Sequence, residues 1–367
     1  MTATLRRPTV HTAPTPAPAL RPGGVAAVLG ARPEVFKLAP VLGALGDAAR
    51  VVRPARDESA AVAGDVRGCR IAVALEGMRR AFAADRPDAV LVPGASDTAV
   101  AAALAAGAQG IPVVRVDAGL RGHEPHRAEE QNRVVLDRAA DVLCAATPGD
   151  VGNLEAEGLG DRDVRVTGTT AVEAVRHRLG SEPGRLAVLR DRGLRPDDYV
   201  LATLGHVDDE EALFSLANQL AGVVDAGHPV VLPADPRTKA ALARAGALSC
   251  GMGLRVVDRL WHSEFLALAR HAALLVTDSD AVLEEATVLK RPVLAVGRQT
   301  ARPEALRDFG VPVGPGDDLT DLALDWLADG DDRRAALAAL PSPFGDGRGG
   351  RRIAAAVRDV VRTGARR

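Results

Sequence analysis

The strongest constraint on the fold is a set of ten short apolar runs, separated by longer segments with helical periodicity. They lie at residues 25–29, 89–94, 111–119, 141–147, 164–168, 199–205, 228–235, 254–258, 273–280 and 292–297. Strands that are apolar without alternation are buried on both faces of a sheet. Their alternation with helices predicts parallel sheets with right-handed crossovers. We therefore expect an α/β fold with two doubly wound, Rossmann-like domains that face a cleft.

A polar, turn-rich segment at 177–198 divides the ten strands into five and five. We expect an N-terminal Rossmann-like domain over 25–180 and a C-terminal, nucleotide-binding Rossmann-like domain over 181–345. After a glycine-rich break, residues 346–367 predict a final helix. Residues 1–24 are rich in Pro, Thr and Ala and lack the apolar stretch of a signal peptide, so we expect a disordered tail.

Composition narrows the classes of function. Apolar residues make up 47% of the chain, and the formal net charge is −2. A balanced charge argues against a general partner for nucleic acid or membrane surfaces. Cys69, Cys144 and Cys250 form no CxxC pair, and Cys144 sits in an apolar run that predicts a core position. No run is apolar and long enough to span a membrane. We therefore expect a protein of the reducing cytoplasm.

Polar side chains follow many of the predicted strands. In open α/β sheets, ligands bind beyond the carboxyl ends of the strands. If the two domains face each other, one cleft is therefore lined by the residues that follow their strands: Arg32, Ser96, Asp97, Asp117, His206, Asp235, Asp278, Ser279 and Asp280.

The segment GARPEVFKLAPV (30–41) leads from the first strand into a helix. Pro33 suits a first helical turn, whose free N–H groups attract anions. Arg32 and Lys37 add two positive charges there, so the segment favours a diphosphate site. In the alternative interpretation, Arg32 pairs with Glu34 or Asp117, and Lys37 is a solvated surface residue.

Several segments, in order along the chain, carry a resemblance to a known family. They are GARPEVFKLAPV, VDAGLRGHEPHRAEEQNRVVLDRAADVLCAAT (116–147), VTGTTAVEAV, PADPRTKAAL, TDSDAVLEEATVLKRPVLAVGRQTARPEAL and SPFGDGRGGRRI. Together they resemble the UDP-N-acetylglucosamine 2-epimerase family over nearly the whole chain from residue 25. The resemblance implies the two-domain GT-B architecture, with a last helix that crosses back to the first domain, and a homodimer joined through first-domain helices.

The family's reaction inverts C2 of the sugar in UDP-N-acetylglucosamine to give UDP-N-acetylmannosamine. The enzyme removes the C2 proton and eliminates UDP to leave a 2-acetamidoglucal. It then adds UDP back and returns a proton to C2 on the other face. The resemblance implies no metal or redox cofactor. It implies carboxylates for the proton steps and cations for the departing diphosphate.

The resemblance also implies roles for individual residues. Positions that match family residues near UDP are occupied by Arg32, Lys37, Arg133, Ser279 and Glu285. The arginine and serine positions hold phosphate oxygens, and the Glu285 position accepts from both ribose hydroxyls. Asp117 and Glu129 match catalytic acids of the family, although Asp117 stands where the family has a glutamate.

The sugar end of the expected site departs from the family pattern. Ala95 stands where the family has an aspartate, and Asp97 follows two residues later. Asp97 either replaces that acid or N-caps the next helix. The family's HRxEN loop has shrunk, so that His206 remains as a catalytic candidate or as a polar surface residue. Asp280 replaces a glycine near the expected diphosphate and should repel it unless its side chain turns away.

Three interpretations therefore stay open at this stage. The first is a divergent 2-epimerase, for example of antibiotic sugar biosynthesis, that uses Asp117, Glu129 and either His206 or Asp97. The second is a non-catalytic homologue that binds a sugar nucleotide or partners an active epimerase. The third is a hydrolysing or glycosyl-transferring enzyme on the same fold.

Overall fold

The computed structural model describes residues 24–30, 32–53, 67–205, 210–244, 253–297 and 299–363, without the side chains of residues 32, 33 and 67–70. Two expectations fall outside this description. The tail predicted over 1–24 lies outside it except for Gly24, and His206 lies outside it entirely. Arg32 begins a helix, but its side chain is outside the described residues.

The N-terminal sheet has six parallel strands in the order β2-β1-β3-β4-β5-β6. The strands are β1 (Val25–Val28), β2 (Ala49–Val52), β3 (Ala89–Val92), β4 (Val113–Ala118), β5 (Val142–Ala145) and β6 (Asp163–Val166). The helices of this half are α1 (Arg32–Leu45), α2 (Arg67–Ala84), α3 (Asp97–Ala108), α4 (Ala128–Ala139) and α5 (Pro148–Ala156), and a short 3-10 helix, η1, covers Gly46–Ala48. The central strands β1, β3, β4 and β5 are buried along their whole length, as their continuous apolar sequences require.

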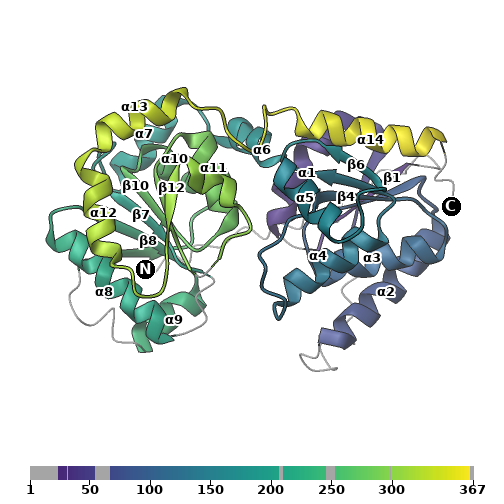
Figure 1. The fold of residues 1–367 in the computed structure, drawn as a ribbon, viewed down its shortest axis with the longest axis horizontal. Coiled ribbons are helices and arrows are strands. Elements are labelled where there is room, and N and C mark those ends of the chain that lie inside the picture. Colours follow the sequence, from purple (N-terminus) through teal and green to yellow (C-terminus); the bar gives the residue numbers. More distant parts are fainter. Residues whose placement is uncertain are drawn as a thin grey trace, which may run out of the picture.

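The C-terminal sheet is also parallel, in the order β12-β11-β10-β7-β8-β9. Its strands are β7 (Val200–Thr203), β8 (Val230–Ala234), β9 (Arg255–Asp258), β10 (Leu274–Thr277), β11 (Val293–Val296) and β12 (Gly310–Val313). The surrounding helices are α7 (Glu182–Asp191), α8 (Glu210–Asp225), α9 (Pro236–Arg244), α10 (His262–His271), α11 (Asp280–Leu289), α12 (Leu319–Ala328) and α13 (Gly330–Ala339), with the 3-10 helix η3 at Pro303–Arg307. Helix α6 (Ala171–Arg178) lies between the two halves in Figure 1.

The predicted fold class is confirmed, since two doubly wound parallel sheets stand side by side. All ten predicted strands are present, but the sequence prediction missed β2 and β12. Both are edge strands, so they need less apolar surface than a central strand. β2 has no fully buried residue, and β12 contains Gly310 and Pro312.

The last helix, α14 (Gly349–Thr363), crosses back to the N-terminal half, as expected (yellow in Figure 1). Its buried residues Ile353 and Val357 join the apolar cluster formed by Val25, Leu38 and their neighbours. Arg165 of β6 forms an ion pair with Asp359 at 2.9 Å. The first and last described elements, β1 and α14, thus belong to the same half. Within the described part of the chain, no helix is both long and apolar enough to cross a membrane.

Candidate functional site

An ion cluster lies where the two sheets face each other. Lys37 of α1 reaches across to both halves of the molecule. Its Nζ donates to Asp117 Oδ2 at 3.0 Å and lies 3.6 Å from Glu284 Oε2. Asp117 lies at the end of β4, whereas Glu284 belongs to α11 of the C-terminal half. Because Lys37 is ion-paired and only 22% exposed, the alternative of a solvated surface lysine is wrong.

Arg302, just before η3, completes the cluster from the C-terminal half and is fully buried. It donates from Nε to Glu284 Oε1 at 2.5 Å and from Nη1 to Asp150 Oδ2 at 3.2 Å. Its Nη2 lies 3.9 Å from Asp117 Oδ1. A guanidinium has five donors in one plane, so one arginine can bind carboxylates from both halves at once. Arg302 therefore ties α5 and β4 to α11.

The turn after β4 aims the Asp117 carboxylate into this cluster. Asp117 has a φ of 56°, in the left-handed region that non-glycine residues rarely adopt. Two residues later, Gly119 has a φ of 78°, and a Cβ there would lie 2.1 Å from the Asp150 carbonyl oxygen. Buried Asp137 of α4 fixes the turn, because it accepts from Gly119 N at 3.0 Å and pairs with Arg121 at 2.8 Å. Contacts from a side chain of α4 thus stabilise the strained turn.

The cluster controls the ionisation of its members. Burial alone would raise the pKa of Asp117, but the charges of Lys37 and Arg302 outweigh burial and lower it to about 2. Burial opposes the charge on Lys37, yet the carboxylates of Asp117 and Glu284 raise its pKa above the ordinary value. Both groups are therefore charged at neutral pH. Such a carboxylate is a weak proton acceptor but a strong partner for cations.

The segment after β3 tests one of the two sequence-based alternatives for Asp97, the one that made it the N-cap of the next helix. Ser96, rather than Asp97, is the N-cap of α3, since its side chain accepts from Ala99 N at 3.3 Å. Asp97 is the first helical residue, and its Oδ1 accepts from Asn132 Nδ2 at 3.0 Å. The same amide group donates to the Ala95 carbonyl at 2.9 Å. The capping role is therefore wrong, and Asn132 of α4 holds Asp97 beside Ala95.

Helix α4 presents two adjacent acids in different environments. Glu129 is exposed at the start of the helix, whereas Glu130 is 7% exposed. The Glu130 carboxylate accepts from Gly122 N at 3.0 Å and from Arg133 Nη1 at 2.8 Å. Glu130 thus fixes the loop before α4 and orients Arg133. The catalytic role of Glu129 and the phosphate role of Arg133 stay predictions.

The N-terminus of α11 holds the residues expected near a diphosphate. The Ser279 backbone N–H donates to Thr277 Oγ1 at 3.1 Å, and its side chain makes no capping bond to α11. Asp280 Oδ1 accepts from Thr300 Oγ1 at 2.5 Å and from Ala301 N at 3.0 Å. The Asp280 carboxylate is therefore turned toward the loop before η3. An acid at this position is expected to repel a diphosphate unless its side chain turns away, and the Asp280 side chain is turned away.

Two other expected residues take part in local contacts. Asp235 Oδ1 accepts from Thr238 N at 2.8 Å, which gives it a role at the start of α9. Glu285 Oε1 lies 2.7 Å from Nε2 of His262, the first residue of α10. Both side chains of this pair are mostly buried. The sequence singled out Glu285 but not its histidine partner.

Sequence reasoning missed Arg302, Glu284 and Asp150 as members of the cluster. Asp150 lies in α5, Glu284 in α11 and Arg302 in the loop before η3, so their spacing in the sequence gave no sign that they meet. The available signal was the TARPE segment at 300–304, which was used for the resemblance without a role for its arginine. Glu304 of the same segment accepts from Thr147 Oγ1 at 2.6 Å and adds a second link between the halves.

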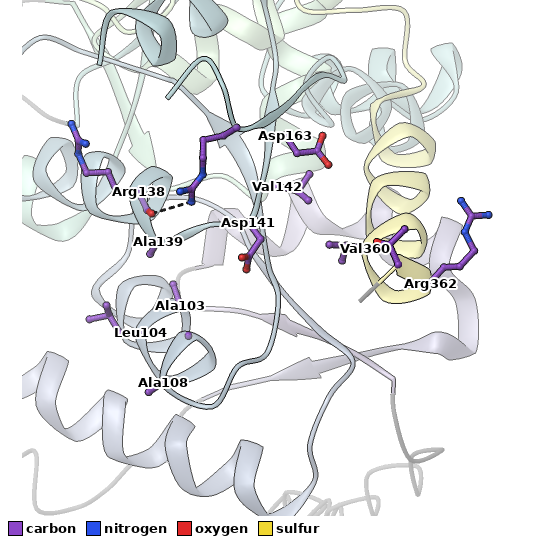
Figure 2. Close-up of a pocket in the computed structure, with 13 residues that line it drawn as sticks. Ala103, Leu104, Ala108, Arg138, Ala139, Asp141, Val142, Asp163, Val360 and Arg362 are labelled. Carbon is purple, nitrogen blue, oxygen red and sulfur yellow. Dashed lines mark hydrogen bonds between the residues drawn. The ribbon is translucent and has the colours of Figure 1, made fainter. Parts of the chain in front are cut away.

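A groove of about 1180 Å³ lies elsewhere on the N-terminal half (Figure 2). It is lined by residues of α3, α4 and α14 and by Asp141, Val142 and Asp163 at the amino ends of β5 and β6. Ligands of open α/β sheets bind at the carboxyl ends. This groove is therefore on the wrong edge to belong to the ion cluster. The described part of the chain contains no group of three or more His, Cys, Asp or Glu residues placed to hold a metal ion.

Comparison with known proteins agrees with this geometry. The family model described as UDP-N-acetylglucosamine 2-epimerase matches residues 60–358. The UDP-N-acetylglucosamine 2-epimerase of Methanocaldococcus jannaschii is 27% identical, over 89% of this chain and 96% of its own. The Escherichia coli K12 enzyme of that name is 30% identical, over 79% of this chain and 80% of its own.

One solved structure extends the comparison to three dimensions. The M. jannaschii UDP-GlcNAc 2-epimerase in complex with UDP-GlcNAc and UDP superimposes with a TM-score of 0.76 at 26% identity. The match covers 92% of this chain and 99% of that one. The likeness therefore spans both halves of the molecule and the junction between them.

Proposed function

Because the chain belongs to the UDP-N-acetylglucosamine 2-epimerase family, we propose that it interconverts UDP-N-acetylglucosamine and UDP-N-acetylmannosamine. The observation that carries this proposal is the charged cluster of Lys37, Asp117, Glu284 and Arg302 at the carboxyl edges of both sheets. Such a cluster supplies fixed charges in a mostly buried site, where they act strongly on a departing anion.

The nucleotide is proposed to lie between the halves. Arg32, Lys37, Arg133 and Ser279 bind the diphosphate, because they bring cations and a hydroxyl to the start of α1, to α4 and to the start of α11. Charge-assisted bonds of this kind are the strong ones. Glu285 accepts from the ribose hydroxyls. The turned-away carboxylate of Asp280 supports this placement, since it removes an acid from the path of the diphosphate.

The reaction needs one group that takes the C2 proton while the C1–O bond to UDP breaks. A C1=C2 double bond then forms. UDP returns to C1 on the face it left, and a proton is delivered to C2 on the face opposite to the one from which it was removed. Asp117 is a poor acceptor, since it is ion-paired and has a pKa of about 2. We assign it to holding Lys37 and Arg302 in place. Glu129 is the proposed proton carrier, with Asp97 and His206 as the other candidates.

A second candidate function is that of a non-catalytic protein that binds a sugar nucleotide. Ala95 favours it, because it follows β3 at a position where the resemblance implies an acid. The cluster would then hold the two halves together without proton transfer. Binding of UDP without turnover is the signature of this alternative.

The test is a proton NMR time course of the purified protein with UDP-N-acetylglucosamine. We expect UDP-N-acetylmannosamine to accumulate until a constant ratio is reached. Release of free N-acetylmannosamine would instead indicate a hydrolysing enzyme, and no product with UDP still bound would favour the second candidate. Lys37→Met should weaken UDP binding about tenfold or more, because it removes a charge-assisted contact. Lys239→Met is the matched control, because Lys239 is partly buried and pairs with Asp258 within the C-terminal half.

The assembly and the cellular compartment are proposed from the family resemblance and from the composition of the chain. We propose a homodimer joined through helices of the N-terminal half, in the reducing cytoplasm. Leu104 of α3 and Val135 of α4 are large apolar residues that are more than 40% exposed, as an interface requires. A monomer mass in light scattering at micromolar concentration would contradict the dimer.

A further inference from the structure

Four side chains form a continuous row across the junction of the two halves. Glu285 of α11 contacts the imidazole of His262 at the start of α10. The His262 ring stacks on Phe36 of α1, with centroids 4.8 Å apart and planes inclined by 20°. The Arg178 guanidinium, at the end of α6, lies 4.0 Å from the Phe36 ring centroid. His262 is therefore the member that touches both halves.

His262 Nε2 lies 2.7 Å from Glu285 Oε1. Because a carboxylate ion accepts and does not donate, we assign the proton of this bond to Nε2. Nδ1 is buried and has no hydrogen-bond partner among the described residues. The orientation of the ring is thus set by two contacts, the Glu285 carboxylate at one edge and the Phe36 face.

This arrangement also fixes Glu285. One N–H occupies one acceptor direction of Oε1, and a carboxylate offers about four such directions on its two oxygens. Enough acceptor capacity remains for the two hydroxyls of a ribose diol. A carboxylate held in one orientation loses less rotamer freedom when it binds than a freely rotating one.

We propose that His262 is a positioning residue for the nucleotide: it holds Glu285 in the orientation that accepts the ribose 2′- and 3′-hydroxyls. The proposal rests on the nucleotide site described above and adds a residue to it. Through its contact with Phe36, His262 also helps to position α1. Lys37 follows Phe36 directly in that helix. The ribose end and the diphosphate end of the ligand are thereby joined across the cleft.

The experiment measures how much the ribose hydroxyls contribute to binding. Dissociation constants of UDP and of 2′,3′-dideoxyuridine diphosphate are obtained by calorimetry for the parent and for His262→Phe. The phenylalanine keeps the aromatic stack and removes the N–H donor. We expect the parent to bind UDP at least about tenfold more tightly than the dideoxy compound, because bonds to a charged acceptor are lost. In His262→Phe this preference should fall to about threefold or less.

Two further variants separate positioning from general damage. His262→Gln keeps an N–H donor of similar reach and should retain most of the preference. His177→Phe changes an exposed histidine of α6 and should leave both constants unchanged. In the epimerase assay, His262→Phe should raise KM about threefold or more and change kcat by less than about twofold, since ribose binding is uniform in ground and transition states.

A His262→Phe protein that keeps the parent's preference for UDP would overturn the proposal. If the phenylalanine variant does not fold, His262→Ala asks the same question without added volume. A parent protein that binds UDP and the dideoxy compound equally would reject the ribose role of Glu285 together with this inference. A parent that binds neither compound would reject the proposed nucleotide site itself.

Discussion

Asp117 illustrates how one residue is held in an unfavourable conformation by its surroundings. Its positive φ costs of the order of 1–3 kcal/mol. The compensation comes from Lys37 and Arg302, with oxygen-to-nitrogen distances of 3.0 Å and 3.9 Å. Gly119 and Asp137 stabilise the rest of the turn. Strain supported in this way is typical of residues at functional sites.

A first prediction concerns acid unfolding. The pKa of Asp117 is lower in the folded than in the unfolded protein, where an aspartate has a pKa of about 4. Its contribution to the free energy of unfolding is therefore complete above pH 4 and disappears as the pH falls from about 4 to about 2. In Asp117→Asn this part of the pH dependence should be absent.

The measurement is urea unfolding of parent and variant between pH 7 and pH 2. At pH 7 we expect Asp117→Asn to lower the free energy of unfolding by about 3 kcal/mol, because it leaves a mostly buried lysine without its nearest partner. Asp163→Asn, at an exposed ion pair, should change it by less than about 1 kcal/mol. Equal stability of parent and Asp117→Asn at pH 7 would show that the cluster does not stabilise the fold.

A second prediction compares two candidate acids. Glu129→Gln keeps the size of the side chain and removes the proton acceptor, so turnover should fall by roughly two to four orders of magnitude. Asp97→Asn should keep most activity, because an amide oxygen can still accept from Asn132. The readout is kcat for both variants, with UDP affinity measured in parallel. If only Asp97→Asn loses activity, proton transfer belongs to Asp97 and not to Glu129.

Residues of the site were only partly predictable. Asp117 and Ser279 lie at or just after the carboxyl ends of strands, which are positions that sequence alone identifies. Lys37 and Glu285 lie inside α1 and α11, and the motifs that carry the resemblance identified them. Arg302 was missed because a fully buried arginine depends on acids from distant segments. Likewise, His262 opens α10 as one polar residue among many, and its contact with Phe36 depends on how the two halves meet.

At the scale of elements, continuous apolar sequence predicted every central strand, because burial on both faces leaves few other compositions. The edge strands β2 and β12 lacked that signal, since β2 has no fully buried residue and β12 contains Gly310 and Pro312. Helix starts were less predictable. Asp97 was an obvious cap by residue type, but Ser96, one residue earlier, makes the bond.

A third prediction concerns helix α14. Ile353 is fully buried against the N-terminal half, although it is distant from that half in sequence. Ile353→Ala should lower the free energy of unfolding by about 2–4 kcal/mol through lost burial and the cavity that remains. The exposed neighbour Arg351→Ala should change it by less than about 0.5 kcal/mol. Equal effects in urea unfolding would mean that α14 is not part of the N-terminal core.

At the scale of the whole molecule, the buried ion cluster joins the two halves at the place where the nucleotide is proposed to bind. Arg302 and Glu304 from the C-terminal half bind Asp150 and Thr147 from the N-terminal half. These bonds lie beside the residues proposed to bind the nucleotide. The arrangement of the halves therefore determines the geometry of the site.

A fourth prediction follows from this coupling. Arg302→Met removes the shared cation and leaves three carboxylates without it. We therefore expect the parent to unfold in one thermal transition and Arg302→Met to unfold in two. Arg291→Met is the matched control, because Arg291 is also buried but pairs with Asp197 within the C-terminal half. Scanning calorimetry should show one shifted transition for that control. A single unchanged transition in Arg302→Met would contradict the coupling.

The proposed cleft removes the proton from C2 of a UDP-linked N-acetylhexosamine. NMR of the parent protein with UDP-N-acetylglucosamine in D2O follows that proton. We expect the C2 proton signal to decay as deuterium enters from solvent, even where net conversion is slow. The C2 proton signal should persist in Glu129→Gln. An undiminished C2 signal in the parent, with UDP bound in the same sample, would show that the cleft does not remove this proton.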